Sequence, residues 1–356
     1  MSLRPSETVQ KILISTPAIF RGEMETEELL LTQAWPDTGP TRYSRIEEGP
    51  ASRSTLVLAF RTDPIEKKPG VMIPDYSPAG ILVCSYLSVL YGKRFDPHGL
   101  IEGVGSFKMP DWSSNAILVN PSLPFHSNQP RANLQIPLSL AESKSLVPLL
   151  LGELNEEFAI AVQASSKFYS QALRTFEFDP ETAYLHLITA LEILSNNLDF
   201  APEDLLPDDL RSLLTQIEEN LPNGEKAAKK IRSRLFQVRR KIAKTIENLV
   251  DPQFFDGSDV DQTAALHSID IKKRVLAAYD LRSKYVHTGI TFGSWINRST
   301  EEIQLGKPVL ADKELSEIIH RAPTFIGLER IVRYCILRFL ASNGFCLYPQ
   351  LETNPD

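Results

Sequence analysis

The sequence predicts an α+β domain over residues 1–150, followed by an all-α helical bundle over residues 151–350. In the first part, short runs of β-branched and apolar residues alternate with loops that contain Pro and Gly, a pattern typical of strands. In the second part, apolar residues recur every three or four positions over long segments, as in amphipathic helices. The change of pattern places the predicted domain boundary near residue 150.

Composition and charge are those of an ordinary globular protein. The chain has 356 residues, of which 42% are hydrophobic and 23% are charged, so about two domains can form without metal or disulfide support. The net charge of −7 argues against a protein that coats nucleic acid with its whole surface. It still allows a local basic site.

Cysteine usage and apolar stretches predict a cytoplasmic protein with no membrane partner. The three cysteines are widely spaced and odd in number, so they suggest neither a disulfide framework nor a metal-binding pattern. The first ten residues lack the apolar run of a signal peptide. The longest mainly apolar stretch, Ala79–Gly92, is too short to span a bilayer.

The first part is predicted to hold five short strands and one helix. The strands are expected at Val9–Ile14, Glu27–Thr32, Ser54–Phe60, Ala116–Val119 and Ala132–Leu138. The helix is expected over Ser77–Tyr91, where Gly92 can end it. Asp96–Gly99, which includes His98, is predicted to form a turn. This part shows no acid–base or metal constellation, so a sensor or regulatory role is expected for it.

The second part is predicted to hold five long helices and one helical turn. They are expected at Glu153–Phe176, from Asp179 onward, at Glu225–Leu249, Ser268–His287 and Phe325–Ser342, with the turn at Glu314–His320. Asp179 followed by Pro180 is a strong start signal, because Asp caps free N–H groups and Pro suits the first helical position. Gly289 can end the fourth helix. Together these segments predict a helical bundle.

The fourth of these helices breaks its own apolar pattern. Ile271, Val275 and Ala278 form a stripe whose next member is Arg282, where an apolar residue is expected. His287 follows five residues later, in the last turn. On an ideal helix the two side chains point about 140° apart. They can converge on one small group if the helix end frays, or if a second copy of the chain supplies one of them.

An Arg and a His together suit phosphodiester chemistry. Histidine titrates near neutral pH and can move a proton to or from a ribose hydroxyl, and a helix C-terminus favours its charged form. Arginine offers a planar set of donors to a phosphate whose charge grows in the transition state. The spacing alone is a weak signal, because it often arises by chance. An Arg near a helix end often lies along the surface, and a His there often caps carbonyls.

Two segments of the second part resemble those of a known family. The segment Ala278–Gly289, AYDLRSKYVHTG, resembles the signature helix of the HEPN superfamily, in particular of its Apea-like branch. The segment Tyr184–Leu194 resembles that family's helix with an internal Glu, which here is Glu192. The resemblance covers about residues 151–345 and implies an all-α HEPN-like helical bundle.

The resemblance also implies an activity. Active members of the family are metal-independent endoribonucleases that need no cofactor, and they dimerise so that two Arg-x4-6-His motifs face one cleft. His287 would transfer the proton at the 2′-hydroxyl or the leaving oxygen, Arg282 would hold the scissile phosphate, and Glu192 would orient Arg282. Cleavage of this kind leaves a cyclic phosphate and a free 5′-hydroxyl.

Relatives of this kind include toxins and antiviral defence proteins. This implies RNA, with tRNA as a candidate, a homodimer and a regulatory protein as partners. Many active members carry Asn, Asp or His directly after the Arg, where this chain has Ser283, whose hydroxyl can still support the site through a hydrogen bond. The branch paired with nucleotidyltransferase antitoxins has Tyr two residues after the His. Gly289 stands there, so that form of regulation is not implied.

A basic stretch gives an independent indication of RNA binding. Between residues 226 and 244 there are nine Lys and Arg residues and no acidic residue, which concentrates positive charge in a net-acidic chain. The predicted RNA-binding residues are Lys229, Lys230, Arg234, Arg240, Lys241 and, on the next helix, Lys273. The alternative is a solvated helix face without a ligand.

Two other hypotheses remain open. A catalytically silent HEPN module could serve only for dimerisation or RNA binding, and Ser283 is compatible with that. Alternatively, residues 1–150 could carry the main activity. The enzyme hypothesis requires that Arg282 and His287 of two chains lie near one cleft.

Overall fold

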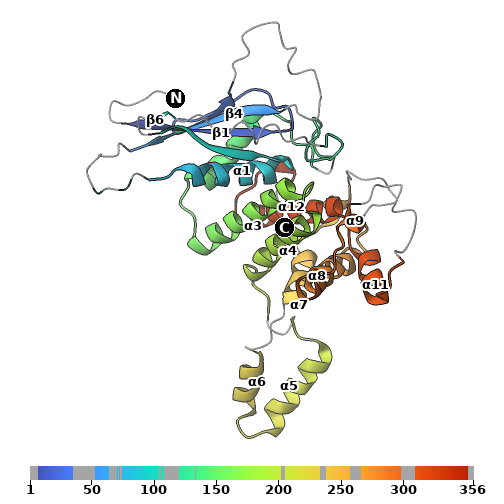
Figure 1. The fold of residues 1–356 in the computed structure, drawn as a ribbon. Helices are drawn as coiled ribbons and strands as arrows, with labels where there is room; N and C mark the ends of the chain where they lie inside the picture. Colours follow the sequence, from blue (N-terminus) through green and yellow to red (C-terminus); the bar gives the residue numbers. More distant parts are fainter. Residues whose placement is uncertain are drawn as a thin grey trace.

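A computed structural model of the chain shows a mixed α and β architecture, in which an antiparallel sheet lies beside a group of helices (Figure 1). It describes residues 7–34, 53–63, 70, 72, 74–103, 106–107, 120–132, 134–201, 205–232, 238–256, 266–297 and 309–351. The sheet comes from the first part of the chain and most of the helices from the second. The α+β character predicted from the sequence is confirmed.

Six strands within the described residues form one sheet in the order β2-β3-β4-β1-β5-β6. They are β1 (Thr8–Thr16), β2 (Met24–Glu25), β3 (Leu29–Gln33), β4 (Ser54–Thr62), β5 (Asp96–Gly103) and β6 (Ser106–Phe107). Their pairings are antiparallel. β1 lies between β4 and β5, and its Ile12 and Ile14 are fully buried. Three predicted strands thus have counterparts in β1, β3 and β4.

The predicted turn at Asp96–Gly99 is wrong, because these residues begin β5. Pro97 lacks an N–H group, and Gly99 has a φ of +91°. Both features are typical of turns, but here they lie where the register between β1 and β5 shifts. A β-bulge of this kind tolerates Pro and Gly inside a paired strand.

The predicted strand at Ala132–Leu138 is also wrong. Leu134 forms only an isolated bridge with Arg131, and tight backbone hydrogen bonds follow from Ile136 to Leu134 and from Ser139 to Pro137. Leu134 and Ile136 are nevertheless buried, so the alternation of apolar residues reports a buried loop rather than a strand. The predicted strand Ala116–Val119 lies outside the described residues.

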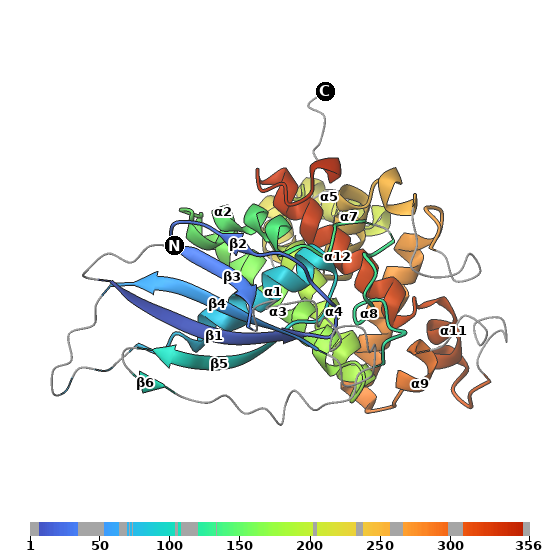
Figure 2. The ribbon, with the colours of Figure 1, turned by 90° about the horizontal axis from the view of Figure 1, so that it is seen from above.

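Helix α1 (Ser77–Tyr91) packs between the sheet and the other helices. It has the predicted bounds, and Gly92 ends it with a φ of +62° and a hydrogen bond from its N–H to the carbonyl of Ser88. The helix contacts β1 and β5 on one side and α3 on the other. Figure 2 shows the strands side by side at one end of the molecule, α9 and α11 at the other, and α12 across the middle.

The second part of the chain is helical. Its helices are α2 (Val147–Leu151), α3 (Glu156–Thr175), α4 (Pro180–Asn196), α5 (Asp208–Asn220), α6 (Gly224–Arg232), α7 (Val238–Leu249), α8 (Ile271–Thr288), α9 (Gly293–Ile296), α11 (Lys313–Arg321) and α12 (Phe325–Ser342). In the described part of the chain, 3-10 helices also lie at Leu140–Leu146, Pro252–Phe255 and Pro349–Leu351. The predictions for α3, α4, α8, α11 and α12 hold to within a few residues. Asp179 caps α4 by accepting a hydrogen bond from the N–H of Thr182.

The single helix predicted over Glu225–Leu249 is replaced by two helices, α6 and α7, with different neighbours. α6 packs on α5, a helix that the sequence did not predict, and Figure 1 shows the pair projecting from the rest of the molecule. α7 packs on α4, α8 and α12. The two helices therefore belong to different cores. Ile242 and Ile246 belong to the main core, whereas Ala228 belongs to a small cluster with Leu206 and Leu214.

The main core is continuous across residue 150. Phe125 contacts Phe176 and Phe325, and the last two rings stack with centroids 3.9 Å apart. A fully buried ion pair adds a polar connection, since Arg131 Nη2 lies 2.6 Å from Oε2 of Glu329 on α12. The described residues of the sheet, α1 and the helical part other than α5 and α6 thus share one hydrophobic cluster.

Candidate functional site

Helices α4 and α8 place Arg282 beside Glu192. The apolar side of α8 is completed by Leu281, which is fully buried, so Arg282 is turned toward the edge of the core with 30% of its side chain exposed. Its Nη2 lies 3.5 Å from Oε2 of Glu192, and its guanidinium carbon lies 5.9 Å from the ring centroid of Tyr279. Burial raises the pKa of Glu192, and Arg282 partly opposes this.

The last turn of α8 presents His287 to solvent. Gly289 ends the helix with a φ of +69°, and its N–H donates to the carbonyl of Tyr285. Val286 and Ile290 on either side are also exposed. No described residue hydrogen-bonds to the His287 ring, and Ser283 beside Arg282 is half-buried. The structure therefore brings Arg282 to Glu192 but does not bring His287 to either of them.

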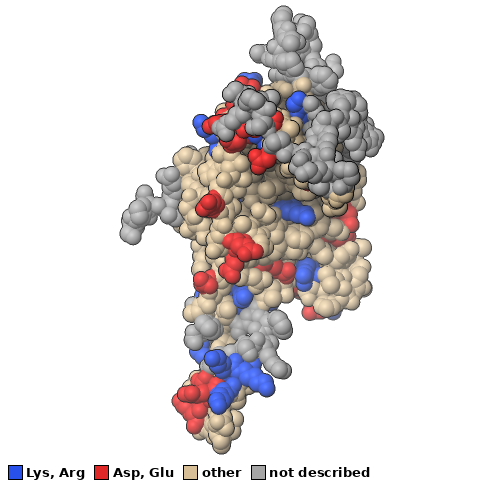
Figure 3. All heavy atoms as spheres, turned by 90° about the vertical axis from the view of Figure 1, so that its left-hand side faces the viewer, with Lys and Arg blue, Asp and Glu red and all other residues tan. Residues whose placement is uncertain are grey.

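The predicted RNA-binding residues lie on three helices. Lys229 and Lys230 are exposed on α6, Arg240 is exposed on α7, Lys273 is exposed on α8, and Lys241 Nζ lies 3.3 Å from Oδ1 of Asn196. Arg234 lies outside the described residues. Figure 3 shows Lys and Arg side chains over the projecting α5–α6 pair at the bottom of the view, beside a group of acidic side chains.

Part of the basic stretch is neutralised by acidic partners. Arg239 forms a two-pronged ion pair with Asp280, at 2.9 and 3.0 Å. Glu247 contacts both Lys244 and Lys272. The exposed basic residues without such a carboxylate partner in the described chain include Lys229, Arg240 and Lys273.

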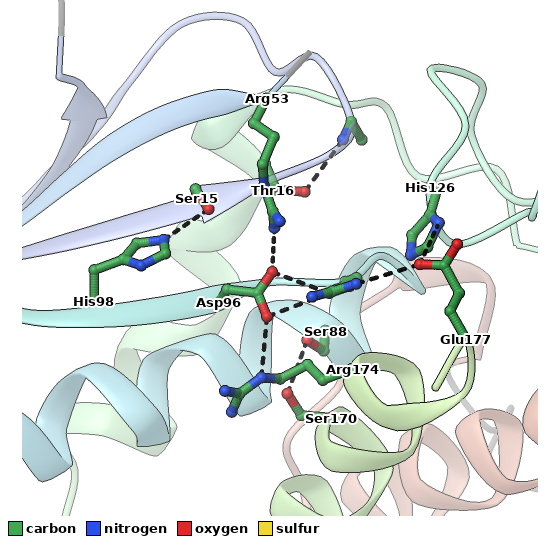
Figure 4. Close-up of polar contacts among 12 residues, drawn as sticks. Ser15, Thr16, Arg53, Ser88, Asp96, His98, His126, Ser170, Arg174 and Glu177 are labelled. Carbon is green, nitrogen blue, oxygen red and sulfur yellow. Dashed lines mark hydrogen bonds and ion pairs between the residues drawn. The ribbon is translucent and has the colours of Figure 1, made fainter. Parts of the chain in front are cut away.

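A second polar site, missed in the sequence, lies where β5 meets the end of α3. Asp96 accepts hydrogen bonds from Arg53, Arg94 and Arg174, with Arg94 Nε 3.0 Å from Oδ2 and Arg174 Nε 3.0 Å from Oδ1. Figure 4 shows the carboxylate of Asp96 between Arg53 and Arg174. Burial tends to raise the pKa of Asp96, but the three guanidinium groups outweigh it and hold that pKa below its usual value.

The same site contains two histidines. Ser15 Oγ lies 2.8 Å from Nε2 of His98, and His126 Nδ1 lies 3.0 Å from the carbonyl oxygen of Asn120 and 3.8 Å from Oε2 of Glu177. Burial lowers the pKa of both histidines, and for His126 it falls to about 3. Ser15 is fully buried in the central strand, so the Ser–His pair cannot act as a nucleophile on a ligand from solvent.

A pocket of about 430 Å³ opens beside Asp96. It is lined by Arg94, Asp96, Pro97, His98, Gln171, Arg174, Thr175, Phe178 and His186. Arg53 and Arg174 lie 43 and 78 residues from Asp96 in the chain. Only the fold brings them together, so no local spacing in the sequence signals this site.

Among the described residues, no three His, Cys, Asp or Glu side chains are placed to hold a metal ion. None of the described helices is both long and apolar enough to cross a bilayer. Comparison of the chain with family models, curated proteins and solved structures found no match.

Proposed function

We propose that the chain is a metal-independent endoribonuclease that acts as a homodimer through Arg282 and His287. The observation that carries the proposal is the place of Arg282, which Glu192 holds at the edge of the core while His287 is exposed at the end of the same helix. The Arg-x4-His resemblance supplies the reaction class.

In the proposed reaction, His287 accepts the proton of a ribose 2′-hydroxyl, and the 2′ oxygen attacks the adjacent phosphorus. The bond to the 5′ oxygen breaks, and that oxygen takes a proton from solvent water and leaves as a 5′-hydroxyl, while the protonated His287 returns its proton to solvent. Arg282 stabilises the added negative charge on the phosphate oxygens, and the hydroxyl of Ser283 can donate a further hydrogen bond. The other product is a cyclic phosphate.

The geometry of α8 favours a site shared by two copies. Arg282 and His287 diverge by about 140° around an ideal helix, so both converge poorly on one phosphate from a single chain. In a homodimer, His287 of one copy can face Arg282 of the other. The exposed Val286 and Ile290 flank His287 and offer apolar area for that contact. Lys229, Lys230, Arg240, Lys241 and Lys273 would then contact RNA phosphates beyond the cleft.

A silent HEPN-like module for dimerisation or RNA binding is the second candidate. The contact with Glu192 favours it, because a paired Arg282 has less charge to offer a phosphate. Ser283 at the position after the Arg favours it too. The two candidates differ in one property, since only the enzyme cleaves RNA.

The test is cleavage of a labelled RNA pool, mainly tRNA, by the purified full-length chain in EDTA. We expect His287→Ala and Arg282→Ala each to lower the rate by about 100-fold or more. The matched controls are His320→Ala, an exposed His in the last turn of α11, and Arg274→Ala, an ion-paired Arg on α8. Both controls should cleave like the unsubstituted chain.

Each outcome separates the candidates, provided that all variants keep their secondary structure and oligomeric state. Cleavage lost in the two site variants alone supports the enzyme. Cleavage that survives both substitutions overturns the assigned site. RNA binding and dimerisation without cleavage by any form supports the silent module.

A further inference from the structure

The site around Asp96 carries more positive than negative charge. Arg53, Arg94 and Arg174 surround Asp96, and Arg94 Nη1 also lies 3.5 Å from Oε2 of Glu177. Three guanidinium groups therefore face two carboxylates, which leaves one unit of positive charge. Because Arg53, Arg94 and Asp96 are largely withdrawn from water, this excess acts over a short range in a low dielectric and attracts an anion.

Arg174 is the cation that a ligand can reach. Its side chain is 39% exposed, whereas those of Arg53 and Arg94 are 4% exposed and that of Asp96 is 9% exposed. Asp96 accepts a hydrogen bond from Nε of Arg174, which orients the guanidinium and leaves its two terminal nitrogens without a partner among the described residues. A group held in this way is preorganised to bind a phosphate through two donors.

The pocket wall next to Arg174 offers flat and hydrogen-bonding surfaces. Phe178 is 66% exposed at the pocket, directly after α3. The imidazole of His186 on α4 also lines the pocket. Gln171 adds an amide with a donor and an acceptor.

We propose that this pocket binds a nucleoside monophosphate. Arg174, supported by the charge of Arg94, holds the phosphate, and Phe178 stacks on the base, as aromatic side chains do in nucleic-acid-binding sites. Gln171 and His186 hydrogen-bond to the base or ribose. The volume of about 430 Å³ lies within the usual range of small-molecule pockets. The pocket is separate from Arg282 and His287 and does not depend on their proposed function.

The alternative is that the arginines only tie α3 to β5. A purely structural network predicts that removing Arg174 weakens folding and that no nucleotide binds. A binding site predicts a loss of affinity in variants that remain folded. Phe178 separates the two, because its exposed side chain contributes little to the core.

The test is calorimetric titration of the full chain, free of RNA, with AMP, GMP, CMP and UMP, and with inorganic phosphate and the corresponding nucleosides. We expect at least one monophosphate to bind once per chain, and its nucleoside and inorganic phosphate each to bind at least about 10-fold more weakly. No binding by any monophosphate overturns the proposal. Equal affinity for inorganic phosphate also overturns it, because the base would then have no role.

Variants assign the binding to this pocket. Arg174→Gln should raise the Kd of the bound monophosphate by about 10-fold or more, and Phe178→Ala should raise it by about 5-fold or more. Arg321→Gln, an exposed Arg on α11, and Ile160→Ala, an exposed apolar residue on α3, are the matched controls. Arg282→Ala should leave the Kd unchanged. If Arg282→Ala raises the Kd while Phe178→Ala does not, the nucleotide binds at the α8 site and the proposal is wrong.

Discussion

Glu192 is the residue on which the setting of Arg282 depends. Its side chain is 16% exposed and its Oε2 lies 3.5 Å from Arg282 Nη2. Glu192→Gln keeps the shape but removes the charge that orients the guanidinium. If the proposed reaction is correct, we expect kcat on RNA to fall by about 10-fold with a smaller change in KM. The reason is that a misplaced Arg282 stabilises the transition state less well, whereas binding of the substrate changes less.

The control for this prediction is Glu247→Gln on α7, which removes another ion-paired glutamate and should leave kcat unchanged. Thermal unfolding of both variants shows whether the effect is structural, since a partly exposed ion pair contributes only about 0–1 kcal/mol to stability. Unchanged kcat in folded Glu192→Gln would contradict the positioning role.

At the scale of elements, the contact between α1 and α12 is a point at which a backbone change should be costly. Gly92 ends α1 with a φ of +62°, and a Cβ there would lie 2.8 Å from Cγ of Arg131 and 3.0 Å from Cζ of Arg333. Both arginines are buried, and Arg333 Nε donates to the carbonyl of Val89 at 2.8 Å. The Cβ must therefore displace buried hydrogen-bonded groups.

We expect Gly92→Ala to lower the free energy of unfolding by about 3 kcal/mol, of which left-handed strain accounts for about 1–2 kcal/mol. Gly289→Ala is the matched control, because its φ is +69° but no atom lies within 4 Å of the added Cβ. Gly289→Ala should therefore lower the free energy of unfolding only by the left-handed strain. Urea unfolding of both variants measures the difference, and equal losses would mean that the crowding at Gly92 relaxes at no cost.

Elements with strong end signals could be predicted from the sequence, and elements without them could not. Asp179 with Pro180 marked the start of α4, and Gly92 and Gly289 marked the ends of α1 and α8. β5 was missed because Pro97 and Gly99, which flank a bulge, are typical turn residues. The apolar alternation at Ala132–Leu138 was misinterpreted as a strand. Apolar periodicity reports which side chains are buried, not which backbone groups pair.

At the scale of the whole molecule, a site can be predicted from the sequence only when its residues lie in recognisable segments. The Arg282–Glu192 contact, between residues 90 positions apart, was expected from the resemblance because each lies in a recognisable helix. The cluster around Asp96 was not expected, because its arginines come from β4's start, the loop after α1 and the end of α3. Each of these residues is unremarkable in its own segment. Charge complementarity across a fold leaves no local periodicity or motif.

The stability of the whole molecule should fall as the pH falls below about 6.5, and His126 is one cause. The His126 side chain is fully buried, and burial, with the nearby charge of Arg94, lowers its pKa to about 3. In the unfolded chain its pKa is near 6.5. Between these values the unfolded chain binds a proton that the folded chain does not, so the free energy of unfolding rises with pH across this window.

His126→Gln removes the titration while its amide can still donate to the carbonyl of Asn120. Between pH 5 and 6, we expect the slope of unfolding free energy against pH to fall by up to about 1.4 kcal/mol per pH unit, the effect of one proton. Asp96 contributes little to the slope in this pH range, because the neighbouring arginines hold its pKa below its usual value. Burial also lowers the pKa values of His98 and His186. These two histidines contribute equally to the slope of the unsubstituted chain and of His126→Gln. His320→Gln, an exposed control, should keep the slope of the unsubstituted chain. Urea unfolding at pH 5, 5.5 and 6 measures the slope for the unsubstituted chain and for the two variants. A slope unchanged by His126→Gln would mean that His126 is protonated in the folded protein.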